Sequence, residues 1–110
     1  MTLLEYPFFI GNKKEISQEK LEVINPYDKN AIGYIFLASL NHVKSALEIA
    51  LEIQPIISKI KFPKKVILLE KLHNIILERS KEFEDLIVRE SGKTVVSARS
   101  EVQNSLLLIK

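Results

Sequence analysis

Residues 90–94, Glu90-Ser91-Gly92-Lys93-Thr94, separate two long amphipathic stretches and decide how the second half of the chain folds. A phosphate-binding Gly-Lys-Thr loop needs another glycine five residues upstream, so that successive backbone N–H groups can surround the phosphates. That position is Ile87, which lies inside an apolar run typical of a helix. We therefore predict a corner between two helices, in which Gly92 takes positive φ after the first helix and Thr94 lies near the cap of the second. Lys93 as a phosphate ligand is the less favoured alternative.

Upstream of this corner, the apolar spacing changes from two residues to about 3.6 near residue 39, which marks the start of the helical region. Asn41 is a suitable N-cap for the first helix. Pro55 is expected to end or kink that helix, because proline cannot donate the backbone hydrogen bond.

Three more helices are expected. Pro63 opens one that runs over residues 64–79, because proline is favoured in the first turn. Ser80 allows a break before a helix over residues 81–90. The last comes after the corner and continues to the C-terminus, where it ends on the apolar run 106–108 without a stop signal.

The first third of the chain has the pattern of strands separated by turns. Gly11-Asn12 suits a tight hairpin, because both residues tolerate positive φ. Asn25-Pro26 ends a later strand, since proline cannot donate to the sheet. Three antiparallel strands are expected, at residues 7–10, 21–24 and 31–37, with a return segment over 13–19. The predicted class is α+β in a single unit, with strands in 1–38 and helices in 39–110.

Composition narrows the function classes. The 110 residues are 46% hydrophobic and 27% charged, the balance of one folded domain. A net charge of +2 argues against a nucleic-acid or membrane partner. The chain has no cysteine, which excludes disulfides, cysteine-based metal sites and a thiol nucleophile within it. It lacks a signal-peptide pattern and an apolar run of roughly 18 residues, so we expect a soluble cytoplasmic protein.

Three segments, taken in order, resemble the N-terminal portion of the aldehyde dehydrogenase superfamily. The first is Phe9-Ile10-Gly11-Asn12 together with the strand that ends in Asn25-Pro26. The second leads from Ala38-Ser39 into the first helix. The third runs from Ile67 through Glu90-x-Gly92-Lys93 to Ala98-Arg99-x-Glu101-Val102. The chain departs from the family at Asp28-Lys29-Asn30, where a glycine is common, at Lys65, where arginine is frequent, and around Gln54, where an aromatic residue is missing.

The resemblance implies the outer part of a Rossmann-like, NAD- or NADP-binding domain in an enzyme that oxidises an aldehyde to a carboxylic acid. In the family the reaction proceeds through a thiohemiacetal on a cysteine, assisted by a glutamate and an asparagine that lie beyond the matched stretch. Because this chain has no cysteine, the 110 residues alone are expected to be inactive and to bind no cofactor. The implied partners are the remainder of the dehydrogenase chain, expected after residue 110, and further copies in a homo-oligomer.

The resemblance also implies a metal site. The main chain near Ile24 and the carboxylate of Glu90 match positions that hold a sodium or potassium ion in some aldehyde dehydrogenases. The alternative, which we favour, is that Glu90 caps or pairs locally at a helix end.

The other polar candidates are assigned structural roles. His42 is expected at the surface and His73 on the side of a helix, and Arg99 and Glu101 are expected in packing or ion pairs. A basic cluster near Pro63 is expected to be solvated; its members are Lys59, Lys61, Lys64 and Lys65.

The rival to the dehydrogenase interpretation is a freestanding small α+β interaction module that pairs its apolar helix faces in a homodimer. The two interpretations differ in the gene downstream of Lys110. The first requires a dinucleotide-binding continuation with a catalytic cysteine, and the second requires a stop codon.

Overall fold

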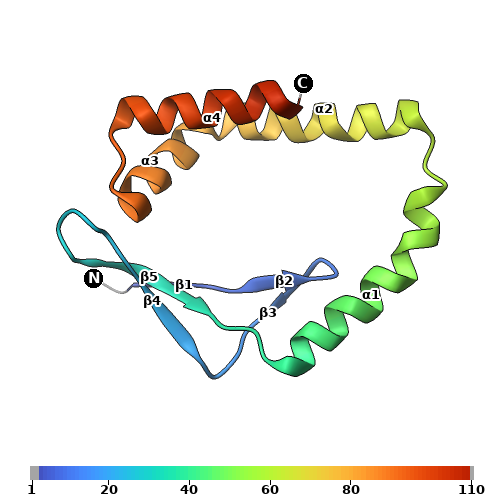
Figure 1. The fold of residues 1–110 in the computed structure, drawn as a ribbon, viewed down its shortest axis with the longest axis horizontal. Coiled ribbons are helices and arrows are strands. Elements are labelled where there is room, and N and C mark those ends of the chain that lie inside the picture. Colours follow the sequence, from blue (N-terminus) through green and yellow to red (C-terminus); the bar gives the residue numbers. More distant parts are fainter. Residues whose placement is uncertain (1–2, 110) are drawn as a thin grey trace. The chain divides into compact units, whose positions relative to one another are not determined.

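A computed structural model describes residues 3–109 as strands followed by helices, which confirms the α+β class (Figure 1). The strands are β1 (Leu4–Tyr6), β2 (Phe8–Ile10), β3 (Lys13–Glu15), β4 (Lys20–Ile24) and β5 (Ala31–Phe36). The helices are α1 (Leu40–Ser58), α2 (Phe62–Glu78), α3 (Ser80–Ser91) and α4 (Val95–Ile109). The change from strands to helices falls near residue 39, as the sequence predicts.

The chain forms two compact units. The first consists of the segment that ends at Ile24 together with Asn30–Lys59, and it holds the strands and α1. The second consists of Asn25–Lys29 and the chain from Ile60 onward, and it holds the other helices.

The larger sheet of the first unit has the order β1-β5-β4. β5 pairs with β4 in antiparallel fashion, as expected for residues 21–24 and 31–37. It also pairs in parallel fashion with β1, a strand that the sequence did not predict, so the expectation of antiparallel pairing alone is wrong for this sheet. Gly33 makes the parallel pairing possible: a Cβ there would lie 2.8 Å from the Leu4 carbonyl oxygen and 2.9 Å from the Tyr6 ring. A glycine inside a strand therefore allows close approach by a neighbouring backbone.

The smaller sheet is the hairpin of β2 and β3, in the register Ile10 opposite Lys13. Its two-residue turn has φ of 56° at Gly11 and 67° at Asn12, as the sequence predicts. Positive φ at both positions gives the twist that a two-residue hairpin requires.

Helix α1 begins earlier than predicted. Ser39, not Asn41, is the N-cap: its Oγ accepts a hydrogen bond from the His42 N–H, and His42 Nδ1 accepts one from the Ser39 N–H. This reciprocal capping box satisfies two backbone donors at once, which outweighs the single bond that an Asn41 cap would supply. Pro55 does not end the helix, since α1 continues to Ser58.

The second unit starts with the turn after β4. The Tyr27 N–H donates to Asn25 Oδ1 at 2.9 Å, and the Lys29 N–H donates to the Asn25 carbonyl oxygen at 2.9 Å. Lys29 closes the turn with φ of 63°, in the left-handed region. This is the segment where the sequence has Asp28-Lys29-Asn30 in place of a family glycine.

The helices of the second unit pack around α4, which runs antiparallel to α2 (Figure 1). The α4 residues Ala98, Val102 and Leu106 are buried, and they are spaced at intervals of four residues. Pro63 lies in the first turn of α2, as expected, and Arg79 separates α2 from α3. Neither α1 nor α2, both described over their full length, has a buried residue. Within residues 3–109, no helix combines the length and the apolar character needed to cross a bilayer.

Candidate functional site

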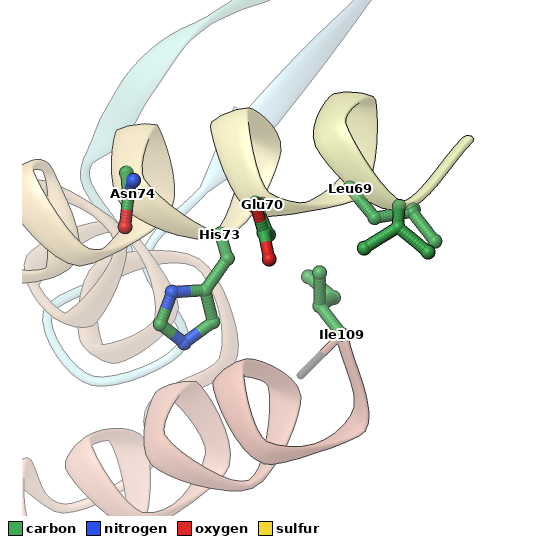
Figure 2. Close-up of a pocket in the computed structure, with 6 residues that line it drawn as sticks. Leu69, Glu70, His73, Asn74 and Ile109 are labelled. Atoms are coloured by element: carbon green, nitrogen blue, oxygen red, sulfur yellow. The ribbon is translucent and has the colours of Figure 1, made fainter. Parts of the chain in front are cut away.

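A groove of about 360 Å³ lies between α2 and the end of α4 in the second unit (Figure 2). Its apolar part and its polar part come from successive turns of α2, and Ile109 closes it from α4 (Figure 2). The lining residues are Val66, Leu69, Glu70, His73, Asn74 and Ile109. This groove suits an inserted apolar side chain with a polar group at its edge.

The groove does not contain catalytic machinery of its own. His73 and Glu70 are three residues apart on one helix, and the groove supplies no hydroxyl or thiol nucleophile beside them. Among the described residues, no three histidine or acidic side chains gather closely enough to hold a metal ion.

A second hollow, of about 380 Å³, lies in the first unit where β5 leads into α1. Ser17 fixes one wall, because its Oγ donates to the Leu37 and Glu19 carbonyl oxygens at 2.5 and 3.0 Å. His42 forms another wall. It is half-buried, with a side chain 21% exposed, so the expectation of a plain surface residue is wrong.

His42 is held by three contacts. Its ring meets the Phe8 ring edge-on with centroids 4.9 Å apart, and its Nε2 lies 3.9 Å from Glu15 Oε2. Its Nδ1 lies 3.0 Å from the Ser39 nitrogen and 2.9 Å from Ser39 Oγ. Both ring nitrogens therefore face neighbours of the capping box and β3, and the residue has a structural role.

The corner at residues 90–94 has the predicted structure. Gly92 takes φ of 71°, and its N–H donates to the Val88 carbonyl oxygen. Thr94 Oγ1 accepts from the Ser97 N–H at 3.1 Å, which makes Thr94 the cap of α4. A Cβ at Gly92 would lie 3.4 Å from Pro26 Cβ. The cap of α3 at Gly92 and the cap of α4 at Thr94 thus both make their hydrogen bonds within the corner and its two helices.

This corner does not fit a phosphate group. The Lys93 N–H faces Ser91 Oγ at 3.4 Å, and the Lys93 ammonium pairs with the Glu101 carboxylate. The donors that a dinucleotide's pyrophosphate would need are therefore engaged within the chain.

Two ion pairs connect α3 with its neighbours. Arg79 makes a two-point contact with Glu82, with Nε and Nη2 2.9 and 2.8 Å from the carboxylate oxygens. The hydrogen bond from Arg79, and then its charge, lower the pKa of Glu82. The buried Glu84 lies 3.9 Å from Arg99 Nε on α4. Arg99 and Glu101 are thus ion-pair residues, as predicted.

Of the cation-site pair, Ile24 ends β4 beside a register shift between Val23 and Ile24. Glu90 lies in the last turn of α3, and within residues 3–109 its carboxylate has no hydrogen-bond or ion-pair partner. The favoured alternative of a local pairing is therefore not seen in the described part. Because the two residues belong to different units, their joint site stays a prediction.

The remaining candidates lie in solvent or in the helix packing. The four lysines near Pro63 are exposed, and Lys61 is the N-cap of α2 without a side-chain cap. Leu106 is buried, whereas Leu107 and Leu108 are 68% and 88% exposed.

The fold matches solved enzymes of one family. A sequence model described as the aldehyde dehydrogenase family matches residues 13–110. The chain belongs to the aldehyde dehydrogenase family. Aldehyde dehydrogenase 21 of Physcomitrella patens superposes with a TM-score of 0.94 at 23% identity, over 99% of this chain and 23% of that structure. The 1-pyrroline-5-carboxylate dehydrogenase of Thermus thermophilus gives 0.94 at 25% identity, over 97% and 21%.

Sequence relatives agree with this family. Malonate-semialdehyde dehydrogenase 1 of Bacillus licheniformis is 30% identical over 95 residues, which are 86% of this chain and 20% of the relative. Lactaldehyde dehydrogenase of Methanocaldococcus jannaschii is 28% identical over 93 residues, which are 84% and 20%. The chain thus spans about a fifth of the length of these aldehyde dehydrogenases. A freestanding homodimeric module is not favoured by these matches.

Proposed function

We propose that this chain is the N-terminal portion of an NAD(P)-dependent aldehyde dehydrogenase that oxidises an aldehyde to a carboxylic acid. The observation that carries the proposal is the family match over residues 13–110, together with the fivefold greater length of the relatives. The chain contributes scaffold to that enzyme, because it has no cysteine to form the thiohemiacetal.

The cofactor belongs to the assembled enzyme in this proposal. A structural neighbour from Corynebacterium glutamicum, 24% identical, is an NAD-dependent benzaldehyde dehydrogenase, which supports a nicotinamide cofactor. We do not place the cofactor at the corner around Gly92, because the backbone donors there already make hydrogen bonds within the chain. We expect the isolated 110 residues to bind neither NAD nor NADP.

The relatives give a starting panel for the substrate class. They act on malonate semialdehyde and lactaldehyde according to their names, so short aldehydes with a carboxylate or hydroxyl group are the first to try. We further propose that the enzyme works in the cytoplasm as a homo-oligomer.

The first test is to measure the intact mass of the protein that carries this chain, as it is made in its own cells. A species several times heavier than 12.6 kDa is expected, and purified it should reduce NAD or NADP only when an aldehyde is present. Purified residues 1–110 serve as the inactive control. A finished protein of 12.6 kDa, or a heavier one inert with every aldehyde of the panel, would contradict the proposal.

A further inference from the structure

The capping box at the start of α1 has a histidine where this motif usually has glutamate or glutamine. Glutamate and glutamine supply a side-chain oxygen that accepts from the backbone N–H of the N-cap residue. In this chain the acceptor is Nδ1 of His42, which lies 3.0 Å from the Ser39 nitrogen. Of these three residue types, only histidine ordinarily changes its charge between pH 5 and 8. The acceptor of this cap is therefore one that mild acid can remove.

The hydrogen bond from Ser39 fixes which nitrogen of the His42 ring carries the proton. A backbone N–H can only donate, so Nδ1 is unprotonated and the neutral ring carries its proton on Nε2. Nε2 lies 3.9 Å from Oε2 of Glu15 on β3, which is too far for a direct hydrogen bond. The Phe8 ring meets the imidazole edge-on and supports this orientation. The neutral ring thus caps α1 and does not bond directly to Glu15.

A second proton on the His42 ring removes the acceptor of the cap. The proton binds Nδ1, so that two donors would face each other across 3.0 Å. The new Nδ1–H can donate to Ser39 Oγ at 2.9 Å, but the Ser39 N–H loses its acceptor. A positive charge in the first turn is also unfavourable, because the free N–H groups there carry partial positive charge. Protonation therefore opens the half of the capping box that the His42 side chain supplies.

The ionisable groups around His42 offer its charged ring another partner. Glu15 lies on β3, and Glu19 lines the hollow beside His42. β2 and the segment 37–39 contain no ionisable residue, and within residues 3–109 no lysine or arginine lines this hollow. The two carboxylates attract an imidazolium, and Glu15 is the nearer to Nε2. The charged ring can therefore leave Ser39 and shorten its distance to Glu15.

We propose that His42 makes the start of α1 sensitive to pH. The neutral ring accepts from the Ser39 N–H, and the protonated ring releases this N–H and pairs with Glu15. The stabilisation from the Ser39 hydrogen bond is present while the ring is neutral, and it is lost as pH falls and the ring takes up a proton. Because His42 is also a wall of the hollow where β5 leads into α1, the same movement changes the shape of that hollow.

The experiment is hydrogen–deuterium exchange of the full polypeptide that carries this chain. Mass spectrometry with fragmentation of the peptide over residues 37–43 reports the exchange of the Ser39 amide. After correction for the intrinsic pH dependence of exchange, the protection of this amide should fall by about threefold or more between about pH 7.5 and about pH 5.5, because its hydrogen bond is lost. Protection of the α4 amides in the same samples should stay constant, which shows that the fold is intact.

Three variants separate His42 from other sources of pH dependence. His42→Gln keeps an acceptor for the Ser39 N–H and takes up no proton in this range, so its protection should not change with pH. Glu15→Gln removes the partner of the charged ring and should move the loss of protection to lower pH. Glu52→Gln removes an equal charge about 15 Å further along α1 and should leave the pH of the loss unchanged.

Some results would overturn the inference. Equal protection of the Ser39 amide at both pH values in the unsubstituted protein is one of them. An equal loss of protection in His42→Gln is another, because the pH effect would then come from a different group. A loss at the same pH in Glu15→Gln and in the unsubstituted protein would exclude Glu15 as the partner of the charged ring. None of these measurements depends on aldehyde oxidation, so the proposed function is tested separately.

Discussion

The imidazole of His42 and the backbone of Ser39 hold each other at the start of α1. His42 Nδ1 accepts from the Ser39 N–H at 3.0 Å, and Ser39 Oγ accepts from the His42 N–H at 3.3 Å. His42, which the sequence predicts to be a surface residue, therefore fixes where the helical region begins.

Ser39→Ala removes this cap and should lower the free energy of unfolding by about 1 kcal/mol. Asn41→Ala is the matched control, since Asn41 lies inside α1 and alanine is the better helix former. Urea unfolding followed by circular dichroism measures both. A larger loss for Asn41→Ala than for Ser39→Ala would mean that the helix starts where the sequence alone suggests.

Lys29→Gly should stabilise the chain by about 0.5–1 kcal/mol, because Lys29 has φ of 63° and glycine adopts that conformation without the steric cost of a Cβ. Lys44→Gly, at an exposed position in the second turn of α1, should destabilise by about 1 kcal/mol. Urea unfolding gives the change in the free energy of unfolding for both variants. Changes of the same sign would contradict the left-handed turn at Lys29.

Gly92→Ala should cost about 1–2 kcal/mol, because the left-handed backbone is strained for a residue with a Cβ. The added Cβ would lie at an ordinary contact distance from Pro26, 3.4 Å, so the backbone conformation accounts for the cost. Gly92→Asn should cost less, since asparagine tolerates positive φ better. Thermal unfolding of the two variants side by side tests the order, and a reversed order would count against the helix corner.

The Arg79–Glu82 pair predicts a dependence on pH. The pKa of Glu82 is lowered in the folded chain by the hydrogen bond from Arg79 and then by its charge. The ionised carboxylate thus contributes stability above the unfolded pKa of about 4.3, and this contribution is lost as pH falls through the lower folded value. Both side chains are more than half exposed, so the effect is small and screened by salt.

The measurement is the unfolding midpoint between neutral and acidic pH in Glu82→Gln and in Glu78→Gln. Glu82→Gln should reduce the fall of the unfolding midpoint at acidic pH. Glu78→Gln should reduce that fall less. Identical pH profiles for the two variants would show that the Arg79–Glu82 pair does not contribute to the pH dependence of stability.

The cation ligand role that the sequence resemblance implies for Glu90 is a hypothesis that a specific ion effect in the assembled dehydrogenase would test. At equal ionic strength, sodium or potassium chloride should raise its melting temperature more than tetramethylammonium chloride does, because the small cation can be held by carboxylate and carbonyl oxygens. Glu90→Gln should abolish the difference. Glu22→Gln, an equal loss of charge on β4, should retain it; a difference that survives in Glu90→Gln would remove Glu90 from the site.

Local chemistry accounts for the parts of the fold that the sequence predicts. Gly11 with Asn12 sets a hairpin turn, Pro63 starts a helix, and Gly92 with Thr94 joins two helices. Each depends on residues within a few positions of one another, so its signal is present in a short window.

Pairings between distant segments could not be predicted in the same way. β1 has three residues, and its parallel partner β5 begins at Ala31. No local sequence pattern therefore predicts the pairing of these two strands. The one available signal is Gly33 inside a strand, whose meaning depends on which backbone approaches it.

The sequence by itself determined the α+β order, the helix corner at Gly92 and the aldehyde dehydrogenase resemblance, because turn, cap and motif residues act over short distances. Only the tertiary structure decided which apolar residues of α2 are packed on α4 and which stay exposed. Both sets have helical spacing, so burial, which depends on the neighbours in space, is what separates them.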